Sequence, residues 1–262
     1  MPDQYYQYSF NKPWVPFTIV QFVAVAVFVA GIYLAVSLWR RGQAHSLRQP
    51  ANACLMLRAL LFDGILHSQI LRLSFSRWLT HLAISWGFVG LLLLTSLLAL
   101  LEHVVPHGWG LYDYFILGDG RFPLEAWGDL WGILLLVGVV AAAVRRWVIR
   151  DDQLDTLSED TTLLIFLFVL SASGFLLEAM RLSNIPEATG VGFSFVGYLM
   201  SIPLRSLKID ADYSSILWIF HMLAVSLFIA YVPFSKLMHA FAAPAQALMN
   251  ISEEAARGDI YG

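Results

Sequence analysis

Residues 218 to 241 read WIFHMLAVSLFIAYVPFSKLMHAF, an apolar stretch that contains two histidines, His221 and His239. Its length and composition are typical of a helix that crosses a lipid bilayer. Eighteen residues make about five helical turns, so a continuous helix would carry both imidazoles on one face, about 27 Å apart along its axis. A histidine within a membrane span is energetically costly unless it binds a partner. The spacing therefore favours two buried ligand groups, one near each side of the membrane.

The composition indicates a membrane protein. Of the 262 residues, 58% are hydrophobic and 13% are charged, whereas soluble domains average about 45–50% apolar and about 25% charged residues. The net charge of −3 gives no indication of nucleic-acid binding. Cys54 is the single cysteine, and an iron–sulfur cluster needs several thiolates. We therefore expect any such cluster to belong to a partner subunit.

Five segments are long and apolar enough to cross the membrane as helices. A helix needs about 20 largely apolar residues to span a hydrocarbon core of about 30 Å, and lipid leaves a spanning backbone no water to bond. We predict an all-α membrane protein that forms one domain, residues 1–262, with five transmembrane helices. The predicted spans are residues 15–39, 79–105, 127–147, 161–180 and 214–241.

The basic residues predict the orientation of these helices. Eleven of the 16 lysines and arginines lie in the first loop, the third loop and the C-terminal segment. By the positive-inside rule the C-terminus is cytoplasmic and the N-terminus is outside. The first cytoplasmic loop is long, and its residues 53–73 mix apolar side chains with Arg58, Asp63 and His67. That pattern favours a helix lying in the membrane interface, either as a docking platform for a peripheral subunit or as a simple connector.

The second predicted span also contains two histidines, His81 and His103, which are 22 residues apart. They are separated by about 6.1 turns and fall within about 40° of one another. Pairing by depth joins His81 with His239, and His103 with His221. Bundles build cofactor sites from side chains on facing helices, and two histidines per iron indicate b-type haems suited to electron transfer. Twenty-two residues rise about 33 Å along a helix, compared with about 27 Å for eighteen residues. His103 and His221 therefore lie at the same depth only if the helices tilt.

A structural role competes with this interpretation. The histidines could lie in the membrane interface and bond to carbonyl or headgroup oxygens. This alternative is strongest for His103, which follows Glu102 at a helix end, and weakest for His221. His67 is ambiguous, since it could be an interfacial histidine or part of a proton path near the inner haem. Small residues could make room for a porphyrin in the second and fifth spans, namely Ser85, Gly87, Gly90, Ala224 and Ser226.

These motifs resemble those of the gamma subunit of respiratory nitrate reductase. In that family two histidines eighteen residues apart flank a PFS segment followed by Lys or Arg, as in HMLAVSLFIAYVPFSKLMHAFAAP, and THLAISWGFVG resembles the haem-ligating second helix with His81 in the ligand position. The segments RRWVIRDDQLDTLSEDTTLLI, SGFLLEAMRL and GYLM resemble a sub-branch, the membrane subunits of heterodisulfide-reductase-like and sulfate-reduction electron-transfer complexes. The resemblance covers the four spans from Leu79 onward.

The resemblance implies a dihaem cytochrome b that passes electrons between menaquinone or menaquinol and Fe–S subunits. His81 and His239 would bind the inner haem, and His221 with one further residue the outer haem. Nitrate reductase has that further ligand ten residues after the first, where this chain has Leu91, which cannot coordinate iron. A Glu-His pair near this helix end recurs in the sub-branch, which favours His103. The implied location is the prokaryotic inner (cytoplasmic) membrane.

The implied partners are a heterodisulfide-reductase-like cytoplasmic Fe–S subunit and, as a further expectation, a periplasmic multihaem cytochrome c. Oxidation of a quinol releases protons as well as electrons, so the site needs a proton acceptor beside a haem. Glu178 and Arg181 are candidates, although they could equally form an i,i+3 ion pair. The remaining candidates are Glu102, Asp129 and His67.

Two other functions fit the same residues. One is the cytochrome b of a hydrogenase or a formate dehydrogenase. The other is a haem-free membrane anchor or proton-conducting scaffold whose histidines relay protons. The chain has no nucleotide-binding motif, Fe–S cysteine set or catalytic triad. We therefore expect an electron-transfer subunit rather than a complete enzyme.

Overall fold

The computed structural model is all-helical in the residues that it describes, which are 14–42, 54, 57–58, 60–150, 158–184, 190–207, 211–238 and 242. Five of the described helices are long and apolar enough to cross a membrane. This confirms the predicted all-α membrane class and the predicted number of spans. The five are α2 (Trp14–Gly42), α5 (Phe75–His103), α7 (Arg121–Ala143, continued by the π-helical turn η4, Val144–Ile149), α8 (Ser158–Ser183) and α10 (Ala211–Tyr231).

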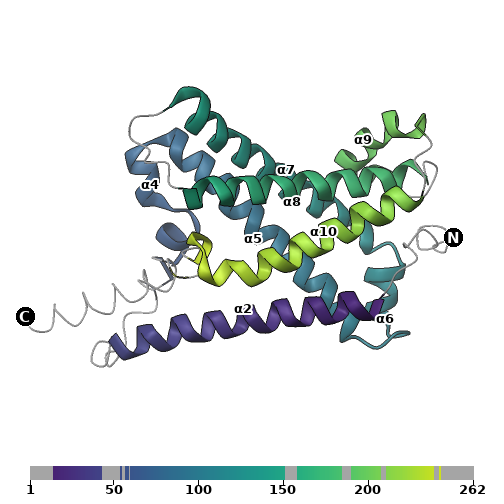
Figure 1. The fold of residues 1–262 in the computed structure, drawn as a ribbon, viewed down its shortest axis with the longest axis horizontal. Helices are drawn as coiled ribbons and strands as arrows, with labels where there is room; N and C mark the ends of the chain where they lie inside the picture. The colour runs from purple at the N-terminus through teal and green to yellow at the C-terminus, as the bar shows by residue number, and fades with distance from the viewer. Residues whose placement is uncertain are drawn as a thin grey trace, which may run out of the picture.

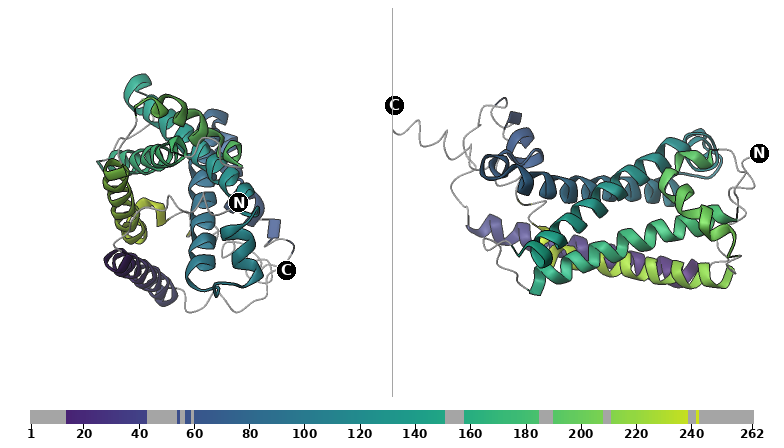
Figure 2. Two further views of the ribbon diagram at one scale, coloured as in Figure 1. Left: turned by 90° about the vertical axis from the view of Figure 1, so that its right-hand side faces the viewer. Right: turned by 90° about the horizontal axis from the view of Figure 1, so that it is seen from above.

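The long helices form a bundle in which the first span, α2, packs against the last, α10. α5 packs on α7, α7 on α8, α8 on α10, and α10 on α2 (Figures 1 and 2). The short helix α4 (Ser68–Leu73) lies at one end of the bundle. The short helices α6 (Gly110–Tyr112) and α9 (Phe195–Arg205) lie at the other end. We call these the α4 end and the α9 end.

Glycines bring α5 and α7 into close contact. A methyl group on Gly87 would lie 2.5 Å from the backbone nitrogen of Leu135, and one on Gly90 would collide with the ring of Trp131. Small residues commonly let membrane helices approach in this way. The prediction that Gly87 and Gly90 make room for a porphyrin is therefore wrong, because α7 occupies the space beside both.

The last span differs from the predicted continuous helix over residues 214–241. α10 ends at Tyr231, and two 3-10 turns follow, η6 (Val232–Phe234) and η7 (Lys236–Met238). Pro233 has no amide hydrogen with which to continue the helical ladder, and Ser235 is extended with φ −108° and ψ 171°. The α-helix therefore does not carry His221 and His239 on one face. His239 itself lies outside the described residues.

The first loop contains short helical pieces where one helix over residues 53–73 was predicted. The π-helical turn η2 (Leu60–Ile65) precedes α4, which has six residues. His67 stands between them in a left-handed backbone conformation with φ 50°. Such a conformation is uncommon for a residue with a side chain, and it turns the chain sharply between the two pieces.

Two tryptophans of α5 hold this loop against the bundle. Trp78 Nε1 donates to the carbonyl oxygen of Leu66 at 2.7 Å, and Trp86 Nε1 donates to that of Ile65 at 3.0 Å. These bonds satisfy carbonyl groups just where the helical pattern is interrupted. A position of this loop in the membrane interface and the cytoplasmic side of the bundle stay predictions.

Replacing Gly87 with valine should destabilise the protein, because the new side chain would collide with the backbone of Leu135. Overpacking of this kind typically costs about 1–3 kcal/mol. We expect a lower midpoint of thermal unfolding for the protein in detergent, followed by circular dichroism. Gly110→Ala is the control, since nothing lies within 4 Å of the added methyl group. An unchanged midpoint for Gly87→Val would contradict the close α5–α7 contact.

Candidate functional site

Two cavities lie inside the bundle, and a histidine lines each of them. The His81 cavity has a volume of about 290 Å³ and is bounded by α5, the α7–η4 junction, α8 and η7. The His221 cavity has a volume of about 280 Å³ and is bounded by α5, α7, α8 and α10. Phe88 and Leu167 line both cavities and separate them. The two spaces therefore follow one another along the bundle.

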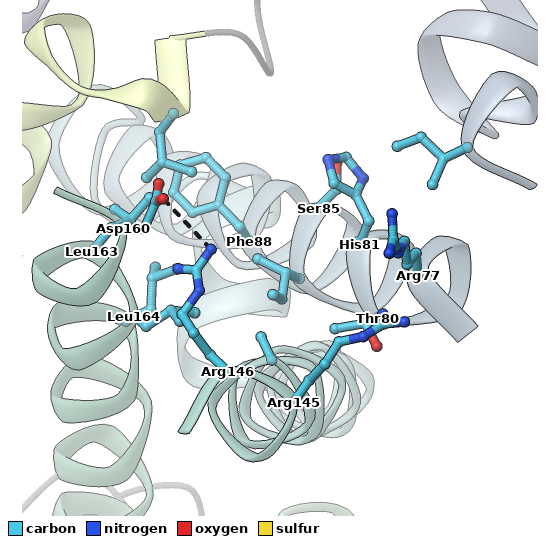
Figure 3. Close-up of a pocket in the computed structure, with 15 residues that line it drawn as sticks. Arg77, Thr80, His81, Ser85, Phe88, Arg145, Arg146, Asp160, Leu163 and Leu164 are labelled. Carbon is cyan, nitrogen blue, oxygen red and sulfur yellow. Dashed lines mark hydrogen bonds and ion pairs between the residues drawn. The ribbon is translucent and has the colours of Figure 1, made fainter. Parts of the chain in front are cut away.

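The His81 cavity is positively charged at its mouth. Figure 3 shows His81 on α5 close to Arg77, with Arg145 and Arg146 of η4 on another wall. These three arginines line the cavity together with a single carboxylate, Asp160. Guanidinium groups form strong, directional hydrogen bonds with carboxylates. The cavity thus combines an imidazole with a wall suited to an acidic ligand.

Asp160 joins three elements beside this cavity. Its Oδ2 accepts from Arg146 Nη2 at 3.5 Å (Figure 3). Its Oδ1 accepts from Lys236 Nζ at 2.8 Å. Asp160 belongs to the first turn of α8, where a negative side chain also complements the helix dipole. One carboxylate therefore fixes the end of η4 and the turn η7 relative to α8.

His67, which the sequence left ambiguous, lies directly against His81. The two ring centroids are 4.6 Å apart with an interplanar angle of 66°. His67 also lines a separate cavity of about 310 Å³ with Trp131. The structure thus brings His67 to the α4-end histidine and not to the carboxylates at the α9 end.

Ser173 orients the ring of His221. Ser173 Oγ lies 2.8 Å from His221 Nδ1 and donates its own hydrogen to the carbonyl oxygen of Leu170 at 3.2 Å. In the tautomer that satisfies both contacts, Nδ1–H donates to Ser173 and Nε2 keeps its lone pair. The absence of a side chain on Gly174 leaves room beside the ring, because a methyl group there would lie 3.3 Å from His221 Cε1.

The wall of α5 that lines the His221 cavity is largely apolar. Its residues are Phe88, Leu91, Leu92 and Thr95, and the Thr95 hydroxyl donates to the carbonyl oxygen of Leu91 at 2.8 Å. His103 ends the same helix eight residues after Thr95, a rise of about 12 Å. The backbone position of His103 is thus known, while its side chain lies outside the described part of the structure.

At the α9 end, side chains from α7 hold the N-terminus of α9. Asp129 Oδ2 accepts from the backbone nitrogen of Val196 at 2.6 Å. Ser194, the residue before α9, donates its hydroxyl to Glu125 Oε2 at 3.1 Å. The first amide groups of a helix have no partner within it, so a carboxylate is well placed there. Asp129 thus acts as a cap supplied by a neighbouring helix.

Glu125 is also the centre of an ion-pair network. Its Oε1 lies 3.0 Å from Arg121 Nε and 3.3 Å from Arg181 Nη2. Arg181 Nη2 is 3.3 Å from Glu178 Oε1 as well, so the i,i+3 pair considered from the sequence is present. The sequence analysis did not select Glu125, although Arg121, Glu125 and Asp129 recur every four residues on one helix face. Glu102 is exposed at the end of α5 and does not line the cavity.

In the part of the chain that the structure describes, no group of three or more His, Cys, Asp or Glu residues lies together to hold a bare metal ion. Each cavity instead contains one histidine on an otherwise mainly apolar wall. A single histidine beside an apolar space fits an axial ligand of a bulky, planar group. It does not by itself form a site for a metal held only by protein.

Replacing Asp160 with asparagine should destabilise the α4 end, because Arg146 and Lys236 lose the carboxylate that joins them. Partly exposed ion pairs contribute roughly 0.2–1 kcal/mol each, so we expect a lower unfolding midpoint at low salt. The difference should shrink in high salt, since salt screens such pairs. Glu159→Gln, an exposed neighbour on α8, is the control. Equal midpoints for Asp160→Asn and the original protein at low salt would refute this role.

The sequence is similar to those of several known proteins. The sequence pattern of the nitrate reductase gamma subunit family matches residues 14–252. The EtfAB:quinone oxidoreductase of Syntrophomonas wolfei is 26% identical over 255 residues, which are 93% of this chain and 34% of that protein. This chain thus spans about a third of that relative's length. No solved structure matches the chain.

Further relatives are subunits E of dihydromethanophenazine:CoB–CoM heterodisulfide reductases. The protein from Methanosarcina mazei is 28% identical over 211 residues, which are 80% of this chain and 71% of the relative. The protein from Methanosarcina thermophila is 24% identical over 263 residues, which are 90% of this chain and 92% of the relative. Since the family pattern covers nearly the whole chain, including all five long helices, the chain belongs to the nitrate reductase gamma subunit family.

Proposed function

We propose that this chain is the membrane cytochrome b subunit of a respiratory electron-transfer complex, with two b-type haems that connect menaquinone or menaquinol to an iron–sulfur partner subunit. The observation that carries the proposal is the pair of successive cavities, each lined by one histidine, within a member of this family. A haem with two histidine ligands supplies one-electron transfer when bound. The protein supplies the ligands, the charge around them and the exclusion of water.

The inner haem is proposed to be bound by His81 and His239 in the His81 cavity. His239 follows the turn η7 directly, and Leu237 of that turn lines the same cavity as His81. A single residue, Met238, therefore separates a residue of the cavity wall from the proposed second ligand. Arg77, Arg145 and Arg146 would bind the haem propionates, which are carboxylates.

The outer haem is proposed to be bound by His221 and His103. With Nδ1–H donated to Ser173, Nε2 of His221 would be available as a ligand, and such a second hydrogen bond is the usual way in which a ligating histidine is oriented. The α5 residues that line this cavity end at Thr95, about 12 Å before His103 along the helix. His103 can therefore reach the iron only if the haem lies toward the α9 end of the cavity.

The names of the relatives support the proposed electron carrier and partner subunits. One relative is named for a quinone and the others for dihydromethanophenazine, which supports a two-electron carrier; we propose menaquinone. Heterodisulfide reductase relatives support an Fe–S partner of that type on the cytoplasmic side, which the positive-inside rule assigns to the α4 end. A periplasmic multihaem cytochrome c at the α9 end and the prokaryotic inner membrane complete the proposal.

The first test is a reduced-minus-oxidised optical spectrum of the purified complex, which should contain b-type haem bands. His81→Ala and His221→Ala should each lower the haem-to-protein ratio by about half, because each removes a ligand of a different haem. His107→Ala is the control, since His107 is exposed and contacts the ring of Tyr112. A spectrum without such bands would instead favour a haem-free scaffold.

His103→Ala should likewise reduce the haem content by half or convert the outer haem from a low-spin to a high-spin state. Electron paramagnetic resonance distinguishes the two results, because loss of one axial histidine changes the spin state of the iron. A full complement of low-spin haem in this variant would show that His103 is not the second ligand. The inner haem, bound elsewhere, is the internal control.

Ser173→Ala tests the orientation of His221. Without the bond to Ser173 Oγ, the ring is free to rotate and Nε2 is a weaker ligand, so haem should dissociate about 10–100-fold more readily. The readout is the transfer of haem to an apo-globin acceptor, together with the midpoint potential of the outer haem. Ser183→Ala is the matched control, because Ser183 also bonds to a carbonyl of α8 but contacts no histidine. Identical transfer rates for both variants would contradict the assigned role.

A further inference from the structure

A third cavity lies on the flank of α5 that faces away from the two cavities assigned to haem. This His67 cavity has a volume of about 310 Å³, and Trp86 and Leu93 line it from α5. These two residues lie about 140–160° around the helix from Phe88, which lines both the His81 and the His221 cavity. Of the residues that bound the third cavity, only Ser85 also lines the His81 cavity. The His67 cavity is therefore separate from both proposed haem sites.

An apolar cavity adjoins the His67 cavity along the contact of α5 with α7. This Leu97 cavity has a volume of about 420 Å³, and Gly90, Leu93 and Trp131 line both spaces. Its other lining residues are apolar or aromatic, among them Leu97, Phe115, Leu124 and Trp127. Leu93 is 65% exposed on the outside of the bundle. A molecule dissolved in the membrane can thus enter the two cavities from the side.

Two residues that line the His67 cavity carry polar groups with no partner in the described part of the chain. Thr80 and Thr95 of α5 donate their hydroxyl hydrogens to carbonyl oxygens four residues earlier, whereas Ser85 makes no such bond within the described ranges. The Nε1–H of Trp131 is buried and has no acceptor among the described residues. A buried donor without an acceptor is energetically costly. Oxygen atoms of a bound molecule would satisfy these donors.

The loop that contains His67 brings this cavity close to the proposed inner haem. His67 has left-handed backbone angles, φ 50° and ψ 46°, and unusual backbone conformations of this kind cluster at functional sites. Trp86, which lines the cavity, holds the loop through its bond to the carbonyl oxygen of Ile65. His67 lines the cavity too, and its ring centroid is 4.6 Å from that of His81. One imidazole ring therefore separates the cavity from a proposed iron ligand.

The charge of the cavity walls limits the kind of ligand. No arginine, lysine, aspartate or glutamate lines either cavity in the ranges that the structure describes, whereas three arginines line the His81 cavity. A phosphate or carboxylate headgroup would be buried here without a cationic partner, which argues against a phospholipid. Both volumes are of the size typical of ligand pockets, about 300–1,000 Å³. The walls favour an uncharged ring with oxygen atoms and an apolar tail.

We propose that the His67 cavity binds the ring of the quinone-type carrier and that the Leu97 cavity binds the beginning of its apolar tail. This inference rests on the proposed function and adds the place of the carrier, at the α4 end beside the inner haem. Ser85 and Trp131 donate to the ring oxygens, and electrons pass between the ring and the haem through the contact of His67 with His81. Oxidation of a quinol at this place breaks two O–H bonds and releases two protons to the water at the α4 end. Its two electrons go one at a time to ferric iron, which becomes ferrous and is reoxidised by the proposed partner subunits.

Photolabelling of the purified complex with an azido derivative of menaquinone-4 supplies a readout other than turnover. Mass spectrometry should find the label on residues 60–73 and on the adjoining parts of α5 and α7, and unlabelled menaquinone-4 should compete with it. Label confined to the α9 end would overturn the inference. Competition by phospholipid but not by menaquinone-4 would overturn it as well, since the cavities would then bind lipid.

Leu97→Trp tests the place of the tail. The larger side chain fills the Leu97 cavity, so the KM for menaquinol-4 in haem reduction should rise at least about tenfold. The KM for menadiol, which has the same ring without the tail, should not change. Leu100→Trp is the matched control, because Leu100 is exposed on the same helix and lines neither cavity. If Leu97→Trp loses haem, as measured after reduction by dithionite, the photolabelling result decides.

Trp131→Phe tests the place of the ring. Phenylalanine keeps an aromatic ring beside Gly90 but has no N–H group, so the KM for menadiol should rise about 2–10-fold, as expected for the loss of one hydrogen bond. Trp127→Phe is the control, since Trp127 lines the Leu97 cavity but not the His67 cavity. If neither menaquinol-4 nor menadiol reduces haem in the original complex, the proposed function is wrong. If both reduce it and the variants behave like their controls, the function stands and this inference is overturned.

Discussion

A polar group inside a membrane bundle must find its partner within the protein, because the lipid offers none. The side chains of this chain follow that constraint closely. Hydroxyl groups in the middle of the long helices, such as those of Ser171 and Ser226, bond to carbonyl oxygens one turn earlier. Three carboxylates toward the two ends of the bundle instead bond to elements other than their own. Asp160 joins η4, α8 and η7, while Asp129 and Glu125 join α7 to α9.

The bundle contains both close helix–helix contacts and cavities. Gly87 and Gly138 allow α5 and α7 to approach until their backbones nearly touch. α5 and α10, in contrast, pack mainly on other helices. The His221 cavity lies between them, whereas the His81 cavity is bounded by α5, η4, α8 and η7. The rings of Phe88 and Phe228, with centroids 5.9 Å apart, bridge α5 and α10 at the level that separates the cavities. α7 and α8 also line the His221 cavity, so four helices enclose it.

The sequence was sufficient for the features that depend on composition and local spacing. Apolar length predicted five spans, and the three-residue separation of Glu178 and Arg181 indicated their ion pair as one of two possible roles. The predicted continuous helix over residues 214–241 was wrong because a local signal was overlooked. Pro233, which is visible in the sequence, marks the end of α10. The sequence could not predict contacts made across helices. The bond from Asp129 to the start of α9 and the central position of Glu125 depend on how α7, α8 and α9 pack, which no local pattern encodes.

The two ends of the bundle differ in charge, and the difference matches two kinds of chemistry. Three arginines and one aspartate line the His81 cavity, a balance that favours an anionic group. At the α9 end, Glu125 pairs with Arg121 and Arg181, and Glu178 pairs with Arg181 as well. Asp129 takes part in none of the ion pairs described there, and its Oδ2 accepts from the backbone nitrogen of Val196 instead. The N-terminus of α9 thus stabilises a buried carboxyl group that no arginine pairs with, so that α9 serves the site without lining it.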